Sequence, residues 1–325
     1  MKINISSCED LEKVKLLISN YRFNDYRNYH IMKKEVTDDY LFQKIKGSIS
    51  KNNYVLIFSE KSKLIGLCVL RRLPLESKIF GFNMGKIEYL IINNPYQEDI
   101  RTKNLVISCI LKLCKEKNIL HLSYRIDNGD YYTIHSLETN GFHLMDTLVT
   151  YCLNLRRKYI LPNVKDCWRI REFRRSDLEE LIDIVGHSFS NTRLYIDPHT
   201  RNKADEFYAE WTKRCCAGSW ADIVKISERK GRINGFATCK LEEKLHNFTG
   251  IKVLGRGLIA ADISTNPFGI YITLCKALIV EGKDVVKADF GELDTQIQNF
   301  SIIKIWQKFG MRILRVKHTF HTWLG

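Results

Sequence analysis

The chain has 325 residues, of which 45% are hydrophobic and 27% are charged, which is typical of a globular protein with room for two domains and excludes a disordered chain. It contains no run of about 18 apolar residues that could span a bilayer. The first residues lack the apolar core of a signal peptide, so we expect a cytoplasmic protein without membrane partners.

The formal net charge of +14 indicates a phosphate-bearing partner or a generally basic surface. The basic residues are spread along the chain in short clusters such as Arg71-Arg72. Because a dedicated nucleic-acid binder usually concentrates its charge on one helix or arm, we do not expect a nucleic-acid partner. The ten cysteines show no C-x-x-C spacing, so reduced thiols and no metal site are expected.

Hydrophobic periodicity in the first half predicts an alternation of helices and strands. The predicted helices are residues 11–21, 38–48, 102–116 and 131–140. The predicted strands are residues 54–58, 64–70, 86–92, 121–126 and 144–153. The first two strands are expected to form a hairpin, and Gly141 follows the last helix as a left-handed stop.

The second half repeats this order of elements. Its predicted strands are residues 168–173, 222–228, 233–240, 257–263, 285–290 and 312–323. Its predicted helices are residues 176–189, 203–215, 270–280 and 300–309. Ser176 and Glu179 have the spacing of a capping box at the start of the first of these helices, and Gly310 follows the last one.

The two halves end alike, with a helix, a glycine stop and a closing strand. The segment around residues 156–166 carries charge, a proline and no sustained periodicity. Internal duplication therefore predicts two tandem domains of α/β (α+β) class, residues 1–156 and 157–325, each a mixed central sheet flanked by helices.

This order of elements resembles the GNAT N-acetyltransferase fold. The stretches GLIAADISTNPFGIYITLCKAL (257–278) and NFSIIKIWQKFGM (299–311) are similar to its acyl-CoA loop and its late helix. Within the superfamily, SKIFGFNMGKI (77–87), HSFSNTRLYIDP (187–198), FYAEW (207–211) and KHTFHTWL (317–324) resemble bacterial dTDP-amino-sugar N-acyltransferases such as dTDP-fucosamine acetyltransferase.

The resemblance implies transfer of an acyl group from acyl-CoA to the amine of a dTDP-linked deoxyamino sugar by direct attack. The acyl group would be acetyl or a larger group such as 3-hydroxybutyryl. A homodimer is compatible with the sequence, which does not fix the oligomeric state. The residues implied to bind CoA are Ile259, Ala260, Ala261, Asn266, Phe268, Gly269, Ile270 and Tyr271.

Two departures from the family pattern affect this expectation. The pyrophosphate loop usually reads Arg/Gln-x-x-Gly-x-Gly/Ala, whereas residues 266–271 contain only Gly269. Trp306 stands where relatives often have a tyrosine that protonates the leaving thiolate, and an indole can donate a hydrogen bond but not a proton near neutral pH.

Three residues are implied to take part in catalysis, and each has a structural alternative. Backbone N–H groups near residues 259–262 would stabilise the oxyanion, and Asp262 could accept a proton or simply cap a loop. Asn299 could touch the pantetheine arm or cap the helix that follows it. Trp306 could lie in the site or in the core.

The substrate-binding candidates are His187, Arg193, Tyr195, Asp197 and His321. Tyr195 could stack on a nucleotide base and Arg193 could pair with its phosphates, or both could lie in an ordinary surface loop. The first domain has no glycine where its own CoA loop would be, so we expect it to lack a CoA site and to help bind the acceptor. Two rival functions remain: an aminoacyl-tRNA-dependent transferase of the peptidoglycan-bridge kind, and a non-catalytic degenerate GNAT module.

Overall fold

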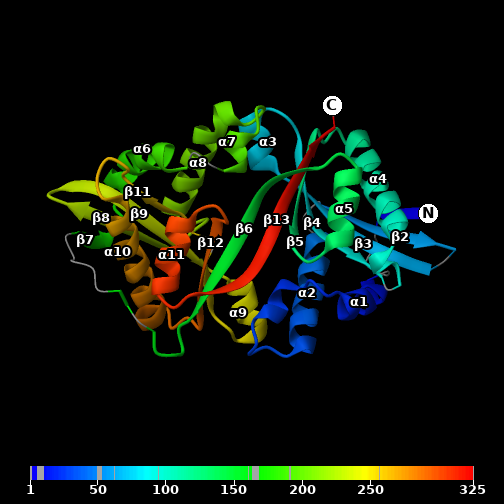
Figure 1. The fold of residues 1–325 in the computed structure, drawn as a ribbon, viewed down its shortest axis with the longest axis horizontal. Coiled ribbons are helices and arrows are strands. Elements are labelled where there is room, and N and C mark those ends of the chain that lie inside the picture. The colour runs from blue at the N-terminus through cyan, green and yellow to red at the C-terminus, as the bar shows by residue number, and fades with distance from the viewer. Residues whose placement is uncertain are drawn as a thin grey trace. The chain divides into compact units, whose positions relative to one another are not determined.

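A computed structural model describes residues 2–5, 11–49, 53–61, 63–93, 95–159, 161–162, 168–189, 192–255 and 257–324. The chain divides into two compact units. We call Met1–Thr147 together with Arg315–Gly325 the N-terminal unit, and Leu148–Leu314 the C-terminal unit. Figure 1 shows both, with most of their helices and strands labelled.

The N-terminal unit is built on a mixed sheet with the strand order β1-β2-β3-β4-β5-β13. Only β4 and β5 are parallel neighbours in it. The strands are β1 (Lys2–Ile5), β2 (Tyr54–Glu60), β3 (Lys63–Arg72), β4 (Met84–Ile92), β5 (His121–Asp127) and the end of β13 (Arg312–Trp323). The helices are α1 (Leu11–Asn20), α2 (Lys34–Ile49), α3 (Pro74–Phe80), α4 (Ile100–Glu116) and α5 (Tyr131–Thr139).

Two hydrophobic cores cover the two faces of this sheet, because side chains alternate along a strand. Leu67 and Val69 of β3 pack with α1 and α2. Cys68 and Leu70, one residue along, pack with α4 and with Leu137 of α5. The alternation therefore assigns every β3, β4 and β5 side chain to one of two faces.

The strands of the C-terminal unit are also mixed in direction and follow the order β6-β12-β10-β9-β8-β7, and β11 pairs with β9 off this path. The strands are β6 (His143–Asn154), β7 (Arg169–Glu172), β8 (Ile223–Arg229), β9 (Arg232–Leu241), β10 (Val253–Gly255), β11 (Ile259–Ala261) and β12 (Phe290–Gln296). The helices are α6 (Leu178–Ser188), α7 (Arg193–Ile196), α8 (Ala204–Cys216), α9 (Glu243–Thr249), α10 (Pro267–Val280) and α11 (Phe300–Lys308).

Both predicted glycine stops are confirmed. Gly141 follows α5 with φ +77° and Gly310 follows α11 with φ +75°. Their amides bond back to carbonyls of the preceding turn, those of Glu138 and Gln307. The same helix, left-handed glycine and long closing strand thus occur twice, as the predicted duplication requires.

The two units differ from the predicted division at residues 156/157, because each closing strand continues into the other unit. From Leu148 onward β6 pairs with β12, which belongs to the C-terminal unit. From Lys317 onward β13 pairs with β5, which belongs to the N-terminal unit. Long-range pairing of this kind leaves no trace in local periodicity.

Three local predictions are wrong. The strand expected at 285–290 begins only at Phe290, because α10 continues into a π-helical turn at Glu281–Val285. The strand expected at 257–263 is present only as the short β11 (Ile259–Ala261), and β10 (Val253–Gly255) before it was not predicted. Ser176 does not start a helix: α6 begins at Leu178, and the Asp177 carboxylate accepts the Arg174 N–H at 2.7 Å.

Three short helices, α3, α7 and α9, were not predicted. Each has seven residues or fewer, too few turns for a periodicity to be visible. Among the described residues, no helix is both long and apolar enough to cross a membrane.

Candidate active site

The strands of the C-terminal unit separate at its centre. β10 and β12 are parallel neighbours only at Val253–Phe290 and Leu254–Gly291. Beyond this point β11 continues along β9, while β12 continues along β6. The backbones therefore diverge, and β11 and β12 do not pair with each other across the gap that they leave.

The N–H groups of Ile259 and Ala261 point toward this gap. The carbonyl of Leu258 and the N–H of Asp262 both bond to β9, at 2.8 and 2.7 Å. In an antiparallel ladder every second residue bonds to the same neighbour, so the residues between them present their N–H groups to the other side. Two donors aimed at one gap suit a developing oxyanion.

Glycines allow β11 and the residues before it to lie close against β9. A Cβ on Gly257 would lie 1.6 Å from the carbonyl oxygen of Thr238. A Cβ on Gly235 of β9 would lie 2.7 Å from the carbonyl oxygen of Ala260. At these two positions backbone meets backbone directly, and a side chain could enter only if a strand moved.

The N-terminus of α10 lies directly after β11 in sequence and is closed by a neutral cap. The side-chain oxygen of Asn266 accepts the N–H of Gly269 at 3.1 Å, and Pro267 occupies the first helical position. A Cβ on Gly269 would lie 2.5 Å from the Trp168 ring. Phe268 is 51% exposed and Ile270 is buried. A neutral cap leaves the positive end of the helix dipole available to a phosphate.

Asp262 holds the turn between β11 and α10. Its Oδ1 accepts the N–H and the hydroxyl of Ser264 at 2.9 and 2.7 Å, and its Oδ2 lies 3.4 Å from Arg232. The bonds from Ser264 outweigh partial burial and, together with Arg232, lower the pKa of Asp262. A carboxylate with a lowered pKa is a weak acceptor for an ammonium proton.

We therefore expect Asp262→Asn to keep kcat within about threefold of wild type, because the amide oxygen can still accept from Ser264. The measurement is a pH–rate profile of both proteins. Since the folded pKa is lowered, the carboxylate contributes stability above its unfolded pKa, and this is lost as pH falls through the folded value. A loss of kcat above about a hundredfold would instead identify Asp262 as the base.

A pocket of about 620 Å³ is lined by both Asp262 and His187. His187 is one of the predicted substrate-binding residues. Its walls also carry Glu179, Glu180 and Asp183 of α6 and Arg232 of β9. His187 lies 3.8 Å from Asp183, one helical turn away. With four carboxylates, this pocket favours a cation and disfavours a phosphate.

The Trp306 side chain of α11 is only 1% exposed, as expected for a residue in the core. Its ring lies 5.4 Å from that of Tyr151. The polar neighbours of its indole N–H are Tyr271 and Cys275 of α10. Burial raises the pKa of both side chains, and hydrogen bonding from the Trp306 indole opposes that rise.

Asn299 stands at the N-cap position of α11 but does not cap the helix with its side chain. Its amide donates instead to the Thr295 hydroxyl at 3.1 Å, at the end of β12. The capping alternative is therefore wrong for the side chain, which stays beside the diverging strand.

The predicted substrate residues Arg193, Tyr195 and Asp197 lie on α7 and its C-cap. The Tyr195 hydroxyl donates to Asp205 at 2.5 Å, and its ring stacks on Tyr208 at 6.0 Å. Burial, followed by the bond to Asp205, raises the pKa of Tyr195. The carboxylate of Asp197 accepts the His199 N–H at 2.8 Å.

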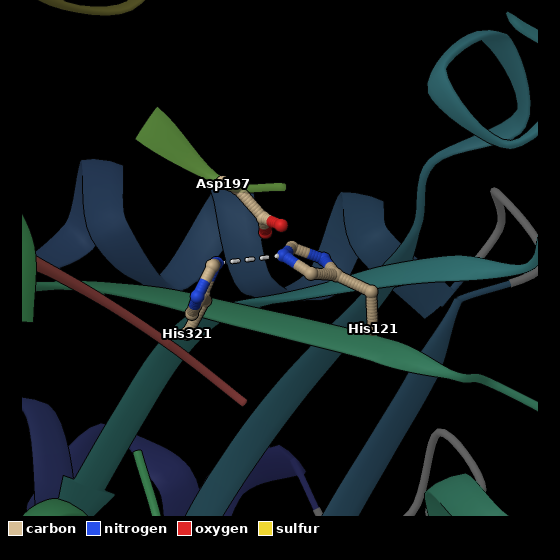
Figure 2. Close-up of side chains that lie close together, drawn as sticks. All are labelled: His121, Asp197 and His321. Carbon is tan, nitrogen blue, oxygen red and sulfur yellow. Dashed lines mark hydrogen bonds between the residues drawn. The ribbon is translucent and has the colours of Figure 1, made fainter. Parts of the chain in front are cut away.

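His321 belongs to the N-terminal unit, on β13. Its Nδ1 lies 3.1 Å from Nε2 of His121, with the rings at 90° (Figure 2). One nitrogen must donate and the other accept, so the pair shares a proton. Sequence reasoning did not identify His121, because pairing across 200 positions is set only by the β5–β13 register.

The N-terminal unit has a comparable divergence, since β4 pairs with β5 only from Met84 to Ile87. A pocket of about 280 Å³ lies beyond it. Its wall includes Lys103, which is 3% exposed and bonds to Asp130 at 3.1 Å and Thr133 at 2.5 Å. The N-terminus of α4 is capped by Asp99, whose carboxylate accepts the Arg101 N–H at 3.0 Å. An anionic cap repels phosphate where the neutral Asn266 does not.

Comparisons with known proteins bear on the fold. No protein-family model matches the chain. A curated relative, the spore coat polysaccharide biosynthesis protein SpsD of Bacillus subtilis (strain 168), is 22% identical over 153 residues, 46% of this chain and 48% of that protein. The match therefore spans about half the length of the curated relative.

Solved structures are similar over the whole chain. A GCN5-related N-acetyltransferase from Sphaerobacter thermophilus is 10% identical with a TM-score of 0.66 over 99% of this chain and 95% of that one. A tandem GNAT protein from the clavulanic acid biosynthesis pathway is 10% identical with a TM-score of 0.56 over 100% and 99%. A fungal glucosamine N-acetyltransferase region is 11% identical with a TM-score of 0.66 over 99% and 38%. The predicted tandem GNAT fold is confirmed.

Proposed function

We propose that the chain is a CoA-dependent N-acyltransferase whose thioester lies in the gap between β11 and β12. The observation that carries the proposal is the pair of N–H groups, those of Ile259 and Ala261, beside the neutral-capped N-terminus of α10. Acyl transfer needs an oxyanion site and a phosphate cradle next to one another. The tandem GNAT fold supports the same chemistry.

The attack is direct, without an acyl-enzyme intermediate. The amine nitrogen forms a bond to the thioester carbonyl carbon, the oxyanion collapses, and the C–S bond breaks to give the amide and a thiolate. Burial raises the pKa of Cys239 to about 12 and of Cys215 to about 11. Thiols held protonated in this way are poor nucleophiles, which supports transfer straight to the acceptor.

In this proposal the Trp306 indole N–H donates a hydrogen bond to the leaving thiolate, and the proton reaches the sulfur from water. Tyr271 lies beside the indole. The proton of the attacking amine leaves through water or a carboxylate. Asn299, fixed by Thr295, contacts the pantetheine arm in this proposal.

We expect Trp306→Phe to lower kcat about tenfold, because one hydrogen bond to the leaving thiolate is lost. Trp306→Tyr restores a donor and is expected to recover most of that loss. The readout is kcat with acyl-CoA at saturation, together with the melting temperature of each variant. Equal kcat in wild type and Trp306→Phe would show that the indole serves packing alone.

The acceptor in this proposal is the amine of a dTDP-linked deoxyamino sugar. Support comes from the curated relative, whose name places it in polysaccharide biosynthesis, and from a structural neighbour described as a glucosamine N-acetyltransferase region. Arg193, Tyr195, Asp197, His187 and His321 are the proposed acceptor residues. The acyl group is acetyl or a larger group such as 3-hydroxybutyryl.

The N-terminal unit is proposed to lack a CoA site. Its α4 carries the anionic Asp99 cap, and the buried Lys103–Asp130 pair occupies the wall of its gap. Both features oppose a pyrophosphate and a pantetheine arm there.

The test is release of CoA thiol from acetyl-CoA in the presence of dTDP-linked amino sugars. The matched control is the same nucleotide sugar with a hydroxyl in place of the amine, which should give only background hydrolysis. Absence of turnover with any nucleotide-linked amino sugar would reject the acceptor. Failure of the purified chain to bind CoA, with binding of aminoacyl-tRNA, would favour the tRNA-dependent alternative, and binding without turnover would favour a degenerate module.

A further inference from the structure

A row of polar side chains crosses four strands of the N-terminal unit. Arg71 of β3 pairs with Lys86 of β4, Lys86 pairs with Ser123 of β5, and Ser123 pairs with His321 of β13. Residues paired across strands project from the same face. The register alone therefore places these four side chains side by side.

The row lies on the face that α1 and α2 cover elsewhere. Leu70, Ile87, Leu122 and Phe320, each next in sequence to a member of the row, pack into the core with α4. The side chains of the row therefore project from the opposite face, the one covered by α1 and α2. They lie past Val69, the last β3 residue in the core with α1 and α2. Arg125, two residues after Ser123, extends the same face and donates to the Thr319 hydroxyl at 3.1 Å.

Next to the row, one carboxylate lies close to both Lys86 and Arg71. Glu88 occupies a bulge in β4, between the Leu70–Ile87 and Val69–Tyr89 pairs. Its carboxylate lies 3.4 Å from Lys86 and 3.8 Å from Arg71. Burial, Arg125 and Arg71 together lower the pKa of Lys86 to about 8, against Glu88, which raises it. Like charges opposite one another destabilise a sheet, and the single Glu88 carboxylate is shared between Arg71 and Lys86.

We propose that Arg71, Lys86 and Arg125 bind the diphosphate group of a nucleotide substrate. The assignment of that substrate rests on the proposed function; the need for a compact polyanion rests on the register and the charge. Guanidinium groups bind phosphate oxygens in pairs, and a lysine adds a point charge. None of the three cations belongs to the acyl-transfer gap of the C-terminal unit.

Two substrates of the proposed reaction carry a diphosphate, the nucleotide sugar and CoA, and calorimetry on the full chain separates them. The ligands are dTDP, CoA and inorganic pyrophosphate, each titrated into wild type, Arg71→Gln and Lys86→Gln. We expect dTDP and pyrophosphate binding to weaken at least about tenfold in each variant, with CoA affinity unchanged. The weakening of dTDP binding with added salt should also be smaller in the variants.

Lys112→Gln is the matched control, since this exposed lysine lies on α4, which covers the other face. Loss of CoA affinity in place of dTDP affinity would assign the diphosphate site to CoA. Unchanged affinity for every ligand in the folded Arg71→Gln variant, or no binding of any of them by wild type, overturns the inference. Failure of acyl transfer with intact dTDP binding would instead contradict only the proposed function.

Discussion

Gly257→Ala is expected to abolish acyl transfer and to destabilise the C-terminal unit by about 3 kcal/mol or more, because overpacking here involves backbone. The added Cβ would start 1.6 Å from the Thr238 carbonyl oxygen. Relief requires β11 to move away from β9, and with it the N–H groups of Ile259 and Ala261. Activity should therefore fall more than about a hundredfold, the loss seen when an oxyanion donor is removed.

The control for this variant is Gly186→Ala on α6. A Cβ there meets nothing within 4 Å, and alanine is favoured over glycine in a helix by about 1 kcal/mol. Stability should rise slightly and kcat should stay unchanged. The free energy of unfolding in denaturant and the initial rate of acyl transfer are measured for both variants. An active and stable Gly257→Ala protein would show that activity does not depend on the position of β11.

Lys103→Met is expected to lower the free energy of unfolding by about 3 kcal/mol, because it leaves the buried Asp130 without its cation. The ammonium also bonds to Thr133 in the same buried group. Burial, opposed by Asp130, lowers the pKa of Lys103. Lys112→Met, an exposed change on the same helix, should alter stability by less than about 0.5 kcal/mol.

This substitution also tests the proposed division of labour between the units. If the N-terminal unit has no CoA site, Lys103→Met should leave the CoA dissociation constant within about twofold of wild type, as for any site remote from the ligand. The measurement is a CoA titration at a temperature where the variant remains folded. A folded Lys103→Met protein that no longer binds CoA would place the cofactor in the N-terminal gap.

Sequence alone predicts the order of elements well where apolar periodicity is long. Helices α4, α8 and α11 and the β2–β3 and β8–β9 hairpins lie close to their predicted ranges, because each has a sustained pattern and a turn or glycine at its end. The prediction is weaker where packing overrides local preference. The π turn after α10 and the break between β10 and β11 are examples, since both depend on contacts with distant strands.

The sequence predicts which segment forms the candidate site, but not how its residues are arranged in space. The loop from Asp262 to Gly269 could be found from its glycine and its place before a helix. The roles of Gly257 and Trp168 could not, because each depends on a contact with a residue far away in sequence. The Arg71–Lys86–Ser123–His321 row depends on three strand registers, and only the Arg71-Arg72 pair gave any hint of it in the sequence.

The central claim is tested most directly by following the acyl group itself. The full chain is incubated with acetyl-CoA labelled in the acetyl carbonyl and a dTDP-linked deoxyamino sugar, and the sugar is examined by mass spectrometry and NMR. The account predicts one labelled acetyl group on the sugar nitrogen, formed by wild type and not by Gly257→Ala. Label that remains on CoA, or appears only as free acetate, would contradict it.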